Sequence, residues 1–129
     1  MVFMEHGLFE VKIEGKLLLV DATGPFNEEL LIQYEKALET CIHTLEISEW
    51  NQVIILHQLS LFTPEAEQVL TNTVINRRSR GLIACAIVLI NVEGESLIKT
   101  QMSRCYDRAR VKHNFTTSIH EANKWLATL

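Results

Sequence analysis

The chain has 129 residues, 47% of them hydrophobic, and a formal net charge of −4. This length predicts a single domain over residues 1–129 with one compact core. The acidic balance argues against a nucleic-acid partner, because phosphate binding needs an excess of Lys and Arg. No apolar run approaches the roughly 18 residues of a membrane span, and Met1 to His6 lacks the features of a signal peptide. We therefore expect no membrane span and a cytoplasmic protein.

Two strands are expected at the start of the chain. Gly7 to Ile13 alternates apolar with polar residues, which indicates an edge strand, whereas the apolar run in Lys16 to Asp21 indicates a strand covered on both faces. Glu14-Gly15 fits the tight turn between them. Because this hairpin leaves a sheet edge that a second copy could cover, the chain could form a homodimer.

A long amphipathic helix is expected next, since apolar residues recur with helical period from Leu30 to Leu45. Asn27 is placed to cap it, and acidic residues follow in the first turn. The charged residues of its other face indicate a solvated surface rather than a metal site. They are Glu35, Lys36, Glu39 and Glu46.

The middle of the chain predicts two buried strands around a second helix. Val53 to Leu56 is a short β-branched run typical of a sheet centre, and Leu82 to Ile90 is apolar throughout, as in a strand between two helical layers. Between them, Thr63 precedes Pro64 as the N-cap of a helix that Gly81 stops. The basic residues near that stop suit the helix dipole better than an anion site. They are Arg77, Arg78 and Arg80.

The last third predicts a third helix around Leu97 to Ala109, then a short strand and a terminal helix. Ser118 and Glu121 have the spacing of a capping box, in which each side chain accepts from the backbone N–H of the other. Basic side chains between Arg104 and His113 fit a solvated helix end. The complete order, ββαβαβαβα, predicts an α/β fold with a mixed, mostly parallel sheet and helices packed on it.

This order of elements, with a closing F…A…WL pattern, resembles the STAS and SpoIIAA-like family, named for an anti-sigma factor antagonist of sporulation. The pattern residues are Phe115, Ala122, Trp125 and Leu126. The resemblance covers nearly the whole chain. It implies a SpoIIAA-like fold and a non-catalytic regulatory role in protein binding or ligand sensing.

The family's antagonist members carry a phosphorylatable serine in an Asp-Ser-x-Gly segment after a central strand. The equivalent stretch here, Gln58 to Pro64, lacks the Asp and the Gly, and its hydroxyl side chains belong to Ser60 and Thr63. These two residues form the candidate interaction or phosphorylation loop. The departure from the motif puts the phosphorylation mechanism in question. Thr63 also has a structural role as a helix cap, worth about 1 kcal/mol.

A second candidate surface is formed by polar residues at the ends of the predicted strands. Ligands of open α/β sheets bind at the carboxyl ends of the strands, and such a set could hydrogen-bond a small polar ligand or a partner loop. The residues are Asp21, Thr23, His57, Ser60, Asn91 and Glu93.

No catalytic group, metal site or cofactor is expected. The three cysteines lie in apolar patterns, which is typical of reduced core residues rather than nucleophiles or ligands. His57 and Ser60 could pair a base with a hydroxyl in a hydrolase, but no Gly-x-Ser-x-Gly elbow surrounds the serine. The cysteines are Cys41, Cys85 and Cys105.

A carrier is the alternative to an interaction domain. Sec14-type lipid carriers have a distantly similar sheet, and the high aliphatic content could line a cavity beneath the first helix. Such a cavity would bind a small apolar or amphipathic molecule. Trp50 and Trp125 are expected to fill the core rather than to stack on a ligand.

Overall fold

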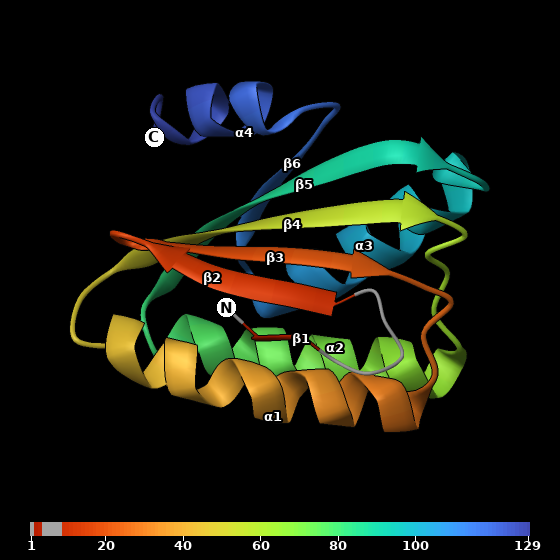
Figure 1. Ribbon diagram of the computed structural model, residues 1–129, viewed down its shortest axis with the longest axis horizontal. Helices are drawn as coiled ribbons and strands as arrows, with labels where there is room; N and C mark the ends of the chain where they lie inside the picture. The colour runs from red at the N-terminus through yellow and green to blue at the C-terminus, as the bar shows by residue number, and fades with distance from the viewer. Residues whose placement is uncertain (1, 4–8) are drawn as a thin grey trace.

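A computed structural model, which describes residues 2–3 and 9–129, contains a six-stranded sheet with helices on both faces (Figure 1). From β2 onward the order of elements is the predicted one, and β1 is an additional short strand. Gly7 and Leu8 of the first predicted strand lie outside the described residues. The elements are β1 (Val2–Phe3), β2 (Phe9–Glu14), β3 (Leu17–Thr23), α1 (Glu28–Leu45), β4 (Trp50–Gln58), α2 (Pro64–Ser79), β5 (Leu82–Val92), α3 (Glu95–Ala109), β6 (Lys112–Thr116) and α4 (Ile119–Leu126).

The strands lie in the sheet in the same order as in the chain, from β1 to β6. β2 runs antiparallel to both of its neighbours, β1 and β3, whereas the four strands from β3 to β6 run parallel to one another. The sheet is therefore mixed and mostly parallel, as the sequence predicts. Its parallel part places the carboxyl ends of β3, β4 and β5 at one edge, where Thr23 lies beside His57 and His57 beside Ile90.

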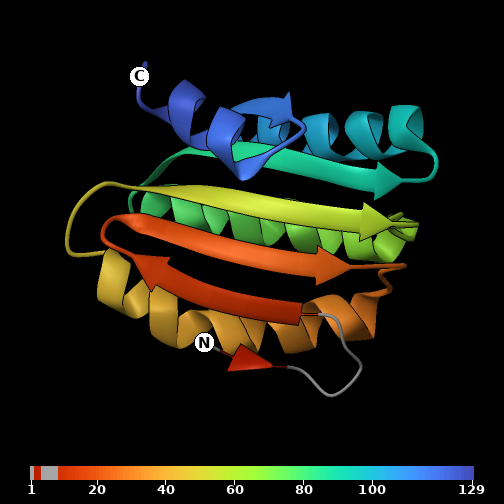
Figure 2. The ribbon, with the colours of Figure 1, turned by 45° about the horizontal axis from the view of Figure 1, so that its top comes forward.

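The helices form two unequal layers, which Figures 1 and 2 show on opposite sides of the sheet. α1, α2 and α3 share the larger core with one face of the sheet. α4 covers part of the other face, where Ala122, Trp125 and Leu126 pack against β4 and β5. β5 thus lies between two helical layers, as predicted for Leu82 to Ile90.

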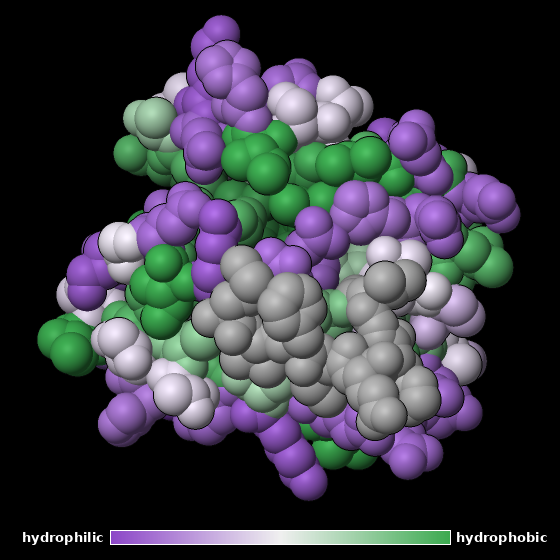
Figure 3. All heavy atoms as spheres, in the orientation of Figure 1, coloured by the Kyte–Doolittle hydropathy of each residue, from purple (hydrophilic) through white to green (hydrophobic). Residues whose placement is uncertain are grey.

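The prediction that β3 is covered on both faces is wrong. Leu18 and Val20 are buried under the α1 side, but Leu17 and Leu19 on the other face are only half-buried. α4 lies mainly over β4, β5 and β6, which leaves this face of β3 partly open. Figure 3 shows the resulting hollow in the surface between α4, at the top, and the sheet below it, with hydrophobic (green) surface beneath α4.

The predicted helix caps are confirmed, with one change in α4. Asn27 Oδ1 accepts from Leu30 N at 2.8 Å, and Ser118 Oγ accepts from Glu121 N at 3.1 Å. The Glu121 carboxylate does not return to Ser118 but accepts from Thr117 N at 3.1 Å. The reciprocal half of the capping box is therefore made one residue earlier than predicted.

Trp50 is a buried core residue, 1% exposed, and its Nε1 donates to the Arg80 carbonyl at 2.9 Å. Trp125 is half-buried and belongs to the smaller core under α4. None of the helices in the described part of the chain has the length and apolar character needed to cross a bilayer.

Candidate functional site

The predicted strand-end residues meet at one edge of the sheet, and two of them are in direct contact. His57 Nε2 lies 2.8 Å from Asp21 Oδ1, on the face of the sheet that α4 leaves open. Thr23 is half-buried beside His57 on the neighbouring strand. This pair is accessible, since the side chains of His57 and Asp21 are 29% and 43% exposed.

Asn91 and Glu93 lie at the end of β5, next to the end of β4, and both are exposed. Glu93 N donates to the Gln58 carbonyl at 2.9 Å, which fixes the two strand ends to each other. Gln58 and Asn91 have positive φ angles of 53° and 49°, so both strands turn sharply here. Among the described residues, the side chains of Asn91 and Glu93 form no hydrogen bond or ion pair with Asp21 or His57.

Ser60 is fully buried and joins two loops. Its Oγ accepts from Gly24 N at 3.1 Å and donates to the His57 carbonyl at 2.5 Å. The hydroxyl therefore bonds the backbone of His57 and not its imidazole, so the base and hydroxyl pair of a hydrolase is not assembled. A kinase could reach Ser60 only if this loop opened.

Thr63 is exposed and begins α2. Its Oγ1 accepts from Ala66 N at 3.1 Å, which confirms the predicted N-cap. Its backbone N–H donates to the Phe26 carbonyl at 3.0 Å. Unlike the buried Ser60, Thr63 presents a side chain to solvent.

The loops that carry these residues, 23–27 and 59–64, are held together by hydrogen bonds and aromatic contacts, and we call this pair of loops the knob. Phe26 N donates to the Leu61 carbonyl at 2.8 Å, and the rings of Phe26 and Phe62 lie 4.7 Å apart. Gln101 of α3 binds Phe62 twice, accepting from its N–H at 3.1 Å and donating to its carbonyl at 2.8 Å. A Cβ atom on Gly24 would lie 2.7 Å from the Cα of Ser60, so the loops touch backbone to backbone.

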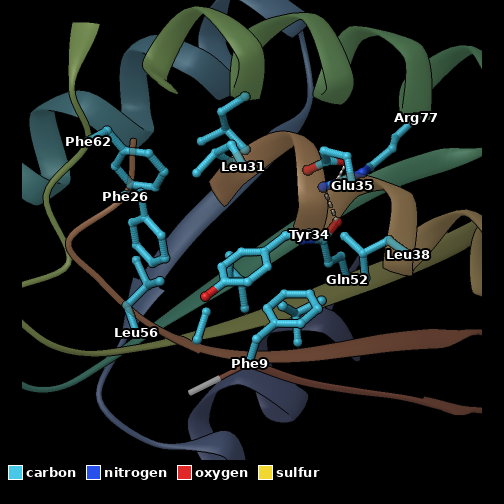
Figure 4. A pocket seen from close by; sticks show the side chains of 14 residues that line it. Phe9, Phe26, Leu31, Tyr34, Glu35, Leu38, Gln52, Leu56, Phe62 and Arg77 are labelled. Atoms are coloured by element: carbon cyan, nitrogen blue, oxygen red, sulfur yellow. Dashed lines mark hydrogen bonds and ion pairs between the residues drawn. The ribbon is translucent and has the colours of Figure 1, made fainter. Parts of the chain in front are cut away.

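A small cavity lies beneath α1, where the alternative hypothesis of a carrier places one (Figure 4). Its volume is about 30 Å³, and most of the side chains around it are apolar. Tyr34 stacks on Phe9 with a centroid distance of 4.0 Å and closes one side. Pockets for drug-sized ligands measure roughly 300 to 1,000 Å³. The cavity beneath α1 is much smaller, so it could hold a lipid only after a movement of α1.

A buried polar cluster at the other end of the cavity was not anticipated. Arg77 of α2 is 2% exposed, and its guanidinium binds Glu35 of α1 and, at 3.3 Å, Gln52 Oε1 of β4. Burial is the largest influence on the Arg77 pKa and lowers it, but the attraction of Glu35 and weaker contributions outweigh it, so the pKa lies above its ordinary value. Arg77 therefore stays charged inside the protein.

Arg80, which is expected only to suit the dipole at the end of α2, also forms ion pairs with α1. Its Nε lies 2.5 Å from Glu46 Oε2, and its Nη1 lies 2.9 Å from Glu39 Oε2. Hydrogen bonds from Arg80 are the largest cause of the lowered pKa of both carboxyls. The prediction that the acidic face of α1 is solvated is wrong for Glu35, which binds the buried Arg77. It holds for Glu39, whose side chain stays 60% exposed while it pairs with Arg80, and Glu46 is partly buried against the same arginine.

A signal for Arg77 was present in the sequence. The buried residues Ala66, Leu70 and Val74 of α2 follow one another at four-residue steps, and Arg77 continues this stripe three residues later. An arginine on the apolar stripe of a helix needs a buried partner, which indicates a carboxylate on a facing element.

The described residues form no metal site, because no group of three or more His, Cys, Asp or Glu side chains among them could hold an ion. Cys85 and Cys105 are buried and Cys41 is half-buried, all as free thiols. Burial raises the pKa of the Cys85 thiol to about 12, which is unsuited to a nucleophile.

Comparisons with family models, with curated proteins and with solved structures find no match to this chain. The likeness to STAS domains therefore rests on the order of elements and on the four residues of the closing pattern. Of these, Ala122 is buried against the sheet, whereas Phe115, Trp125 and Leu126 are half-buried.

Proposed function

We propose that this protein is a non-catalytic interaction module of the SpoIIAA-like STAS type, which binds a protein partner through the knob. The observation that carries this proposal is the set of hydrogen bonds that locks residues 23–27 and 59–64 together beneath an exposed Thr63. A surface that is ordered before binding loses less conformational entropy when the partner arrives. The open Asp21 and His57 pair adds polar groups at the same edge of the sheet.

We further propose that Thr63, rather than Ser60, is the regulatory hydroxyl. Thr63 is exposed, whereas Ser60 is enclosed by two hydrogen bonds. A phosphate on Thr63 would add about two negative charges at the N-terminus of α2, where free backbone N–H groups stabilise them. Such a charge would change partner affinity without unfolding the helix.

The test compares Thr63→Asp with Thr63→Asn in quantitative pull-downs from a lysate of the source cells. Asp and Asn cap helices about equally well, so the two variants differ in charge and not in helix stability. A switch in the knob is supported by proteins that wild type and Thr63→Asn retain and Thr63→Asp loses, or by proteins that Thr63→Asp alone retains.

A charge control separates this effect from general repulsion. Gln33→Glu adds one negative charge on the exposed face of α1, away from the knob, and should retain the same partners as wild type. Equal recovery of every partner by wild type and both Thr63 variants would contradict the proposed switch.

A carrier of a small apolar molecule is the second candidate, and the cavity beneath α1 favours it. At about 30 Å³ the cavity would have to enlarge by an outward movement of α1. Native mass spectrometry of freshly purified protein tests this idea, since a carrier should show an added ligand mass. Protein mass alone would leave the interaction module as the better explanation.

A further inference from the structure

β6 is the last strand of the sheet, and its outer side pairs with no other strand of the described chain (Figure 2). Its ladder with β5 runs without a bulge from Lys112 to Thr116. Within the described residues, no side chain forms a hydrogen bond to the backbone of this strand. An edge of this kind presents a row of free backbone N–H and C=O groups.

The opposite side of the sheet differs from β6, because it ends on a strand of two residues, β1. There β1 pairs with Glu10 and Val11 of β2, and an ion pair of 2.8 Å joins Lys12 to Glu14. Added strands and charges are the usual means by which proteins block edge pairing. In β6 the only fully charged side chain is that of Lys112, at its start.

A shallow groove of about 370 Å³, open to solvent, lies between β6 and α4. Asn114, Phe115 and Thr116 line it from the strand, and Trp125 lines it from the helix. Trp125 is half-buried, so it contacts the core under α4 and also borders the groove. An edge strand next to a helix is the geometry in which domains accept an extended peptide as an additional strand.

Around this groove and the start of β6, two lysines face one carboxylate, although the chain as a whole carries a net charge of −4. Lys124, His120 and Glu121 line the groove, and Lys112 lies at the start of β6. All four are exposed, and neither lysine has an ion-pair partner in the described part of the protein. The carboxylate of Glu121 accepts hydrogen bonds from the backbone and side chain of Thr117. Carboxylates of a ligand would find complementary charge here. A second copy of β6 would instead bring two sets of cations together.

We propose that the groove between β6 and α4 binds an acidic, extended segment of a partner protein as a seventh strand of the sheet. Alternate side chains of that segment face α4, where Lys124 attracts carboxylates and Trp125 contacts apolar atoms. The others face the α3 side of the sheet, where Phe115 lies with Lys99 at 5.8 Å from its ring centroid. This site is separate from the knob and does not depend on the function proposed for Thr63.

The first experiment is an NMR titration of labelled full-length protein at low salt with acidic hexapeptides in which Glu alternates with Val, Ile or Phe. The expected result is a change in the amide signals of β6 and α4, with the knob unaffected. Because only every second amide of a strand faces its neighbour, N-methylation of one set of alternate amides should abolish binding, and methylation of the other set should not.

Charge variants give the second measurement. Lys124→Glu, at an exposed position, should weaken the peptide about tenfold, which corresponds to about 1.4 kcal/mol. Lys36→Glu on the exposed face of α1 is the matched control and should bind as wild type does.

Three results would overturn the proposal. They are no signal change in β6 with any of the peptides, equal binding of both N-methylated forms, and a wild-type dimer in sedimentation velocity whose interface maps to β6. The last result would assign the edge to a second copy of the chain.

Discussion

Replacing Arg77 alone should destabilise the protein more than replacing Arg77 together with its partners. Arg77→Met leaves the carboxylate of Glu35, only 17% exposed at its side chain, without its cation and Gln52 Oε1 without its donor. Removal of one partner of a buried ion pair costs about 3 to 5 kcal/mol. Because Glu35 still reaches some solvent, we expect a value of about 3 kcal/mol, at the lower end of that range.

The combined variants should recover most of this loss. In Arg77→Met with Glu35→Met no charge is buried alone, and the remaining loss of about 1 to 2 kcal/mol comes from the unsatisfied Gln52. Adding Gln52→Met should bring the free energy of unfolding to within about 1 kcal/mol of wild type, since well-packed apolar residues replace buried ion pairs at little cost.

Urea unfolding at pH 7, followed by tryptophan fluorescence, measures these differences. With a denaturant slope of about 1 to 3 kcal/mol per molar urea, the single variant should unfold at a midpoint roughly 1 to 3 M lower than wild type. Equal midpoints for the single and double variants would refute the reasoning, because the carboxylate of Glu35 would then cost nothing when it is left without its cation.

Three further outcomes are expected. Arg80→Met should be less stable than wild type at pH 7, and the urea midpoints of the two proteins should converge towards pH 3. The pKa values of Glu39 and Glu46 are lowered in the folded protein, so their pairing with Arg80 stabilises it above pH 4.5 and is lost as the pH falls through the lowered values. A difference in midpoint that does not change with pH would contradict this. With a thiol reagent at pH 8, Cys41 should react in the native protein and Cys85, with its pKa of about 12, only after unfolding, whereas rapid labelling of both would show that Cys85 is not enclosed. Gly24→Ala should lower the free energy of unfolding by about 1 to 3 kcal/mol, because its Cβ would meet Ser60 Cα at 2.7 Å, and an unchanged value would mean that the loops can separate freely.

The parts of the fold that depend on neighbouring residues could be predicted from the sequence. Asn27, Thr63 and Ser118 cap their helices as expected, because a cap joins groups only three residues apart. The apolar run of β5 predicts its place between two layers for a similar reason, since burial on both faces removes the alternation of side chains.

The parts that depend on distant contacts could not be predicted. Ser60 looked like an accessible hydroxyl, but Gly24, 36 residues earlier in the chain, encloses it. Glu35 looked solvated because the helical pattern shows only that it lies beside the apolar stripe, and its partner Arg77 is 42 residues away. The half-covered face of β3 depends on the length and position of α4, which periodicity alone does not give.

The strand order has a consequence for how the protein forms at the ribosome. Because each strand from β1 to β6 lies next to the one synthesised before it, every new unit can dock on structure that already exists, without threading between finished parts. Assembly can therefore proceed vectorially during translation. β6 with α4, translated after the other elements described, then closes the smaller core, so a ribosome that stalls before this unit would hold a nascent sheet with one face bare.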